Sequence, residues 1–228
     1  IKTEFNKTVY LYTFGAPRIG RKDFAVRHSA RIDKMFRCVH GADPVPKAPV
    51  WPFIHAPING SEYILSNAQG ISISAHKMPA GPGYVNTADK NSWDELSCQS
   101  STSVRQRVVL NYRHRLQTTY STHWADKLSA ALLTILYDGG AAGVVASLQT
   151  IASNVATVYD VMARTLADIA KIKTEQTEPL RGLLACMLAF AGRGVSVTIE
   201  YTERFIRWVF SVTIDRLYKA VRQALKQQ

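Results

Sequence analysis

The sequence predicts an α/β domain with a mostly parallel sheet, followed by an all-helical extension. Residues 9–14 form an apolar, aromatic run that Gly15 and Pro17 end, which predicts a buried strand. Residues 32–40 predict a second strand, and Asp43 follows it, where open α/β sheets place catalytic groups. Beyond residue 143, apolar side chains recur every three or four positions, which predicts amphipathic helices.

Composition narrows the class of protein and of partner. The 228 residues are 46% hydrophobic and 20% charged, which suits one large or two small packed domains. The net charge of +11 favours an acidic partner, either an anionic membrane surface or an acidic protein. No basic run alternates with aromatics as in a nucleic-acid groove, so we expect no nucleic-acid partner. Three widely spaced cysteines favour neither a disulfide framework nor a metal site, and indicate synthesis in a reducing compartment.

The remaining elements of the first part follow from local patterns. Residues 21–30 predict a short helix between the two strands. Residues 62–65 and 71–74 are rich in β-formers and predict the strands of a terminal hairpin. Residues 79–103 are rich in Gly, Pro, Ser and Asn and predict a long loop, and a helical pattern resumes over 124–137.

A glycine-rich stretch at residues 138–143 is the one convincing internal boundary. We therefore expect an α/β part over residues 1–140 and a helical extension over residues 141–228. Helices are predicted over 144–169, 180–191 and 205–225. No stretch approaches the roughly 20 apolar residues that span a bilayer.

Two motifs carry a resemblance to a known family. Thr13-Phe-Gly-Ala-Pro-Arg-Ile-Gly20 and Gly41-Ala-Asp-Pro-Val-Pro46 resemble the downstream half of class 3 (fungal-type) lipases, which are α/β-hydrolases. The resemblance covers about residues 9–133. It implies hydrolysis of glycerolipid or phospholipid acyl esters through a Ser-Asp-His triad, without a metal or other cofactor.

The resemblance also assigns two triad residues. Asp43 matches the triad acid, which orients the histidine and stabilises the imidazolium. Asp-Pro alone is usually a turn former, and the upstream motif favours catalysis instead. His123 lies before a late apolar helix, as the family's histidine does. His114 is the alternative, but two flanking arginines would depress its basicity.

The nucleophile is absent from the printed sequence. No G-x-S-x-G elbow occurs in it, and the serine precedes the aspartate in this fold. We therefore expect the serine and the oxyanion hole in a preceding N-terminal part of the same protein, and no hydrolysis by this chain alone. The alternative is a non-catalytic pseudo-lipase that binds a membrane or a protein partner.

Three other polar residues match the family pattern without a catalytic role. His55 and Glu62 fit its histidine-glycine-glutamate hairpin, lengthened here by an insertion, and are expected to be structural. Arg18, in the first motif, is expected to clamp the turn by bonding carbonyl or carboxylate oxygens.

The last predicted helix raises a second question of function. Its cations stand beside aromatic residues, a combination that suits an interfacial helix on anionic lipid. These residues are Arg204, Arg207, Arg216, Lys219, Arg222 and Lys226, with Phe205, Trp208, Phe210 and Tyr218. The alternatives are a helical bundle that caps the hydrolase part, or a pore-forming or partner-binding module of a toxin. A bacterial lipase effector with an immunity or inhibitor protein, secreted or membrane-associated after cytoplasmic synthesis, would fit this reading.

Overall fold

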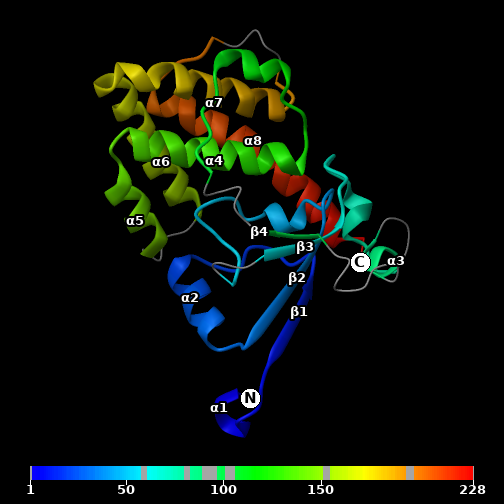
Figure 1. Ribbon diagram of the computed structural model, residues 1–228. Coiled ribbons are helices and arrows are strands. Elements are labelled where there is room, and N and C mark those ends of the chain that lie inside the picture. The colour runs from blue at the N-terminus through cyan, green and yellow to red at the C-terminus, as the bar shows by residue number, and fades with distance from the viewer. Residues whose placement is uncertain are drawn as a thin grey trace. The chain divides into compact units, whose positions relative to one another are not determined.

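The structure is a computed structural model that describes residues 2–57, 61–79, 83–88, 97–100, 106–150, 155–193 and 198–227. The chain, drawn in Figure 1, divides into two compact units. The first unit comprises residues 1–102 with 218–228, and the second comprises residues 103–217. Each is described by itself.

The first unit is built on one sheet of order β1-β2-β3-β4. Strands β1 (Tyr10–Phe14), β2 (Lys34–His40) and β3 (Ser61–Ser66) run parallel, and β4 (Ser97–Ser100) pairs antiparallel with β3. Helix α2 (Lys22–Ala30) lies between β1 and β2 in the chain, as a parallel pair requires. This small parallel sheet is compatible with the predicted α/β class. A one-turn helix, α1 (Lys2–Phe5), precedes β1.

Strand β1 differs from its predicted environment. It was expected to be a buried strand, yet Tyr10, Tyr12 and Phe14 are 53%, 47% and 39% exposed. Among the described residues, β1 pairs with β2 alone, so it is an edge strand. Tyr12 stacks on Phe36 of β2 with ring centroids 4.7 Å apart, which shields only part of this apolar face.

The predicted terminal hairpin is wrong in its second strand. Residues Ile73–His76 form a 3-10 turn, η2, instead of pairing with β3. The Ser72 N–H donates to the Ala42 carbonyl at 2.9 Å, which ties this segment to the loop after β2. The predicted loop over 79–103 contains α3 (Tyr84–Ala88) and β4, and most of the rest of it lies outside the described residues.

The second unit is helical. It contains η3 (Tyr112–Leu116), α4 (Thr122–Asp138), α5 (Ala142–Thr150), α6 (Val155–Ile172), η4 (Thr174–Gln176), α7 (Thr177–Phe190) and most of α8 (Glu203–Leu225). These bounds confirm the helices predicted over 124–137, 180–191 and 205–225. The single helix predicted over 144–169 corresponds to α5 and α6, and residues 151–154 between them are not described.

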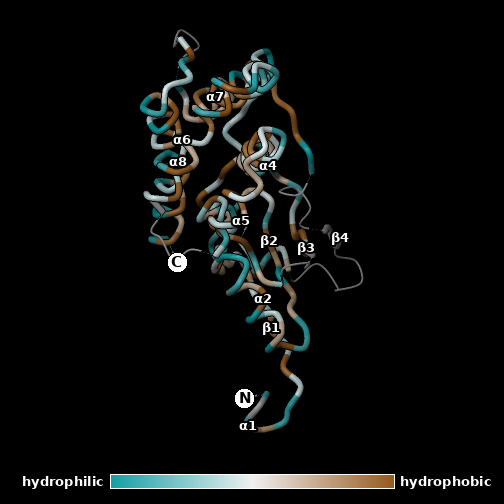
Figure 2. Tube along the Cα trace, turned by 90° about the vertical axis from the view of Figure 1, so that its left-hand side faces the viewer, coloured by the Kyte–Doolittle hydropathy of each residue, from teal (hydrophilic) through white to brown (hydrophobic). Residues whose placement is uncertain are grey.

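Apolar residues concentrate along α4 and α7 (Figure 2). On α7, Leu183, Leu184 and Cys186 are fully buried, so its apolar run is core. Gly182 allows a close approach, because a Cβ there would lie 2.3 Å from the Leu110 carbonyl oxygen. Among the helices of the described ranges, none is both long and apolar enough to cross a membrane.

The compact units do not divide at the predicted boundary near residue 140. Helix α4, which the sequence assigned to the hydrolase part, packs on α7 and belongs to the second unit. The last turns of α8 belong to the first unit, where Val221 and Ala224 pack on Val45 and Ala48. Compactness alone does not test where the lipase-like part ends, so that boundary stays a prediction.

The apolar face of α8 is packed inside the protein. Ile206, Val209 and Leu217 are buried. Thr213 Oγ1 donates to the Met187 carbonyl at 3.2 Å, and Arg216 Nη1 donates to the Phe190 carbonyl at 2.8 Å. This packing favours a helical bundle over an apolar face available to lipid.

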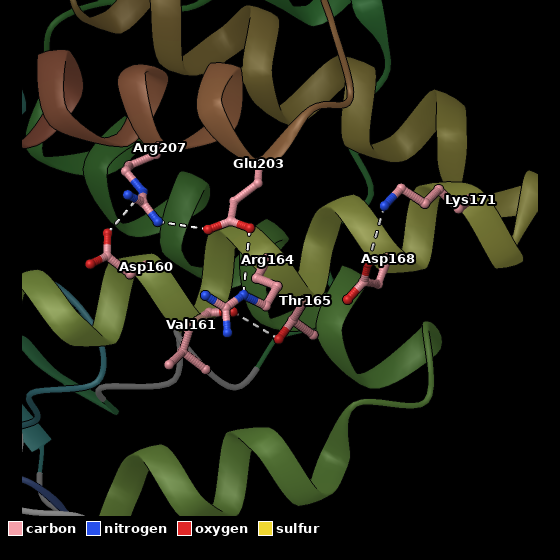
Figure 3. A network of polar contacts seen from close by, with 8 residues as sticks. All are labelled: Asp160, Val161, Arg164, Thr165, Asp168, Lys171, Glu203 and Arg207. Carbon is pink, nitrogen blue, oxygen red and sulfur yellow. Dashed lines mark hydrogen bonds and ion pairs between the residues drawn. The ribbon is translucent and has the colours of Figure 1, made fainter.

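Ion pairs join the outer sides of α6 and α8 (Figure 3). Arg207 lies 3.0 Å from Asp160 and 2.6 Å from Glu203, and Glu203 also lies 3.5 Å from Arg164. The side chains are partly exposed, so each pair contributes little to stability.

Candidate catalytic site

Asp43 lies at the carboxyl end of β2, the position predicted from the sequence. Its side chain is completely buried. The backbone turns tightly here, because the Asp43 N–H donates to the His40 carbonyl at 2.9 Å. Carboxylate Oδ1 accepts the Val45 N–H at 2.9 Å, and Pro44 between them stiffens the turn. One carboxylate oxygen is therefore used to fix the side chain.

The second carboxylate oxygen meets an imidazole and a phenol. Oδ2 of Asp43 accepts from His76 Nδ1 at 2.8 Å and from the Tyr84 hydroxyl at 2.6 Å. His76 ends the η2 turn and is buried, and Tyr84 begins α3. A carboxylate only accepts, so Nδ1 carries the proton and Nε2 is the basic nitrogen of the ring. That arrangement matches the acid and the base of a hydrolytic triad.

Gly15 brings the motif over residues 13–20 into contact with this pair. Its φ is +62°, and its N–H donates to the Cys38 carbonyl at 3.0 Å. A Cβ at this position would lie 2.8 Å from Asp43 Oδ2 and 2.9 Å from His76 Nδ1. Only glycine fits here without displacing the two side chains. The ends of β1 and β2 thus converge on one polar cluster at the same edge of the sheet.

Burial sets the protonation of the groups around the pair. It raises the pKa of the Tyr84 phenol far above its ordinary value, and the Asp43 charge adds to the rise. Tyr84 is therefore a permanent donor. Burial lowers the pKa of His40, which the Asp43 charge partly opposes. Burial raises the pKa of the Cys38 thiol to about 11, which makes it a poor nucleophile.

The two histidines predicted from the sequence lie in the second unit. His123 is exposed in the first turn of α4, and His114 Nδ1 accepts the Asn111 N–H at 2.9 Å as part of the cap of η3. Asp43 belongs to the first unit, where His76 bonds its carboxylate. His123 as the triad base stays a prediction, and His76 is the histidine that the geometry favours.

Sequence reasoning missed His76 and Tyr84. His76 stands just after residues 71–74, which were predicted to form a strand, and no motif marked it as a candidate. Chain order did not single it out, since His114 and His123 also follow Asp43. Tyr84 lay inside a stretch predicted as loop, and nothing in the sequence marked it.

The other family-like residues hold the surrounding loops. His55 Nε2 donates to the Pro46 carbonyl at 2.8 Å. Burial, followed by the charges of Arg37 and Arg18, lowers the pKa of His55 well below its ordinary value, so it stays neutral. Glu62 pairs with Arg37 across β3 and β2 at 2.5 Å. These contacts agree with the structural roles expected of His55 and Glu62.

Arg18 is buried in the turn after β1. Its Nη1 donates to the Pro49 carbonyl at 3.3 Å, and its N–H donates to the Ala48 carbonyl at 2.8 Å. These bonds attach the first motif to the loop after Asp43, as a clamp would. Within the described ranges, no cluster of three or more His, Cys, Asp or Glu side chains could hold a metal ion.

One comparison with known proteins concerns this same region. Residues 1–53 match the family model of class 3 lipases. The matched segment contains β1, α2, β2 and the Asp43 turn. It supports a lipase-type ester hydrolase, although it covers 53 of the 228 residues. His76 and Tyr84 lie beyond the part matched to the class 3 lipases. Comparison with curated proteins gave no match, and comparison with solved structures gave none.

Proposed function

We propose that this protein is a lipase- or phospholipase-type serine esterase of the α/β-hydrolase fold that acts on glycerolipid acyl esters. The observation that supports it best is the buried Asp43–His76 pair, at 2.8 Å, beside a segment that matches class 3 lipases. Asp43 is the triad acid in this proposal. His76 is the preferred base, with His123 as the competing candidate.

The chemistry is acyl transfer in two steps. His76 Nε2 takes the proton of a serine hydroxyl as the serine oxygen attacks the acyl carbonyl. The imidazolium then protonates the departing alcohol, and an acyl-enzyme remains. Water, deprotonated by the same nitrogen, attacks the acyl-enzyme and releases the fatty acid and the free serine. Asp43 keeps the ring in the productive tautomer and stabilises the imidazolium throughout.

The serine belongs, in this proposal, to a segment that precedes β1 in the full-length protein. Among the described residues, β1 is an edge strand, and its outer edge would suit a further parallel strand. A nucleophile elbow at the end of that strand would lie at the same sheet edge as Gly15 and Asp43. The oxyanion hole would come from the same segment.

Histidine variants of the full-length protein test the assignment. We expect His76→Ala to lower kcat/KM on a short-chain p-nitrophenyl ester by roughly 10³-fold or more, because the general base is lost. His123→Ala is the matched variant and should stay within a few-fold of wild type. The opposite result would assign the base to His123. If both variants keep full activity, neither histidine is the base and the proposed triad is wrong.

The alternative function is a pseudo-lipase that binds a membrane or a protein partner without catalysis. A full-length protein with no G-x-S-x-G elbow and no turnover of any acyl ester would support it. In an active enzyme, Asp43→Asn should lower kcat about 10⁴-fold, because an amide can stabilise the wrong imidazole tautomer. Unchanged turnover in that variant would exclude Asp43 from catalysis.

A further inference from the structure

Tyr84 makes a contact that the triad chemistry does not require. Its hydroxyl donates to Asp43 Oδ2 at 2.6 Å, the same oxygen that accepts from His76 Nδ1 at 2.8 Å. The hydroxyl oxygen itself accepts the His40 N–H at 3.1 Å. Three elements therefore fix this phenol: α3 carries it, β2 donates a hydrogen bond to it, and the Asp43 side chain accepts a hydrogen bond from it.

We propose that Tyr84 is a positioning residue that sets the basicity of His76 by competing for the shared carboxylate oxygen. The consequence for catalysis rests on the proposed function, but the effect on His76 does not. A hydrogen bond from the phenol withdraws charge from Oδ2 and so weakens its attraction for the imidazolium. Removal of the hydroxyl should therefore raise the pKa of His76.

If Tyr84 had a purely structural role, its loss would change the pKa of His76 in the opposite direction. If the phenol only held Asp43 in place, its loss would loosen the pair, and burial would then lower the pKa of His76. The direction of the change thus separates the two roles. Wild-type Tyr84 remains protonated at ordinary pH, because burial and the Asp43 charge both raise its pKa.

Among the residues that the structure describes, His40 and Cys38 are the other titratable groups that interact with the pair or with Tyr84. His40 of β2 accepts the Ala42 N–H through Nδ1 at 3.2 Å. Cys38 of β2 packs in one apolar cluster with Tyr84, and its thiol stays protonated. Gly15, just after β1, supplies no side chain. His76 and Asp43 are thus the groups on which loss of the Tyr84 hydroxyl acts directly.

The test is an NMR titration of the His76 ring protons in this chain. Tyr84→Phe keeps the ring, which lies edge-on to Phe14 and His76 at centroid distances of 6.1 and 6.4 Å. We expect the pKa of His76 to rise by about half a unit to one unit. Tyr10→Phe is the matched control: Tyr10 is exposed on β1, and its variant should leave the titration unchanged. An unchanged or lowered pKa in Tyr84→Phe would overturn the inference.

A second measurement covers the case in which Tyr84→Phe does not fold. Replacement of Tyr84 by 3,5-difluorotyrosine keeps the hydroxyl and makes it a stronger donor, so the pKa of His76 should fall. A rise in this variant would contradict the proposal.

In the full-length protein, Tyr84→Phe should move the acid limb of the kcat/KM profile upward by the same amount as the NMR value. A shifted titration without esterase activity would reject the proposed function alone. Activity with an unmoved limb and an unmoved titration would reject the role of Tyr84 alone.

Discussion

At the scale of single residues, the candidate site depends on the lack of a side chain at Gly15 as much as on the side chains around it. Gly15 leaves the space into which Asp43 Oδ2, His76 Nδ1 and the Tyr84 ring pack. Its positive φ adds a second reason for glycine, since other residues reach that region with strain. The lipase motif that ends β1 thus supplies room, and the motif after β2 supplies the carboxylate.

Gly15→Ala should destabilise the chain by roughly 1–3 kcal/mol in a urea titration, since it adds both backbone strain and a close contact. It should also disrupt the Asp43–His76 pair, visible as a changed His76 titration. Gly70→Ala is the matched control, because a Cβ there meets nothing within 4 Å. Equal stability of the two variants would contradict the packing described around Gly15.

Asp43 could be placed from the sequence, whereas His76 and Tyr84 could not. Asp43 stands in a motif of six residues at a strand end, and both features are local. His76 reaches it from 33 residues away on a 3-10 turn, which has no hydrophobic period to recognise. Tyr84 reaches it from 41 residues away within a Gly- and Pro-rich stretch. Tertiary contacts of this kind leave no pattern in the chain.

At the scale of elements, the spacing of apolar residues predicted where helices and strands lie better than it predicted what surrounds them. The helices α4, α7 and α8 lie where the apolar spacing indicated. The run that became β1 predicted a strand correctly, but its edge position depends on which strands pair beside it. The basic and aromatic residues of α8 suggested a lipid-facing helix, while its buried face includes Ile206, Val209 and Phe210. Composition alone could not distinguish these two surfaces.

Two neighbouring residues on α8 test what holds this helix to the second unit. Ile206 is fully buried, and Arg207 pairs with Asp160 and Glu203 on the partly exposed side. We expect Ile206→Ala to lower the free energy of unfolding by about 2–5 kcal/mol through a cavity. Arg207→Ala should cost about 1 kcal/mol or less, because exposed pairs are screened by solvent. Urea denaturation of both variants compares them, and a larger loss for Arg207→Ala would show that the ion pairs dominate.

At the scale of the whole molecule, the charge of +11 remains the feature that the candidate site does not explain. Part of it gathers at the C-terminal end of α8, where Lys219 and Arg222 on the helix and Lys226 just after it are exposed. The same end carries Val221 and Ala224, which pack on the 3-10 turn η1 (Val45–Lys47) just after Asp43. A partner could therefore bind the exposed cations without disturbing the packing of the helix. An anionic membrane surface, already suggested by the composition, suits such a face and the lipid substrate proposed above.

The last prediction tests that surface. The chain should co-sediment with vesicles containing phosphatidylglycerol, and binding should weaken between 0.1 and 1 M salt as the Debye length falls from about 10 to about 3 Å. Replacing Lys219, Arg222 and Lys226 together by Gln should reduce binding roughly tenfold to a hundredfold, because each cation near an anionic surface adds to affinity. The matched control replaces Arg27, Arg31 and Arg113, three exposed cations elsewhere, and removes the same charge. If both triple variants lose equal affinity, net charge alone explains binding and α8 has no special role. Equal binding of the wild-type chain to neutral phosphatidylcholine vesicles would reject the electrostatic mechanism itself.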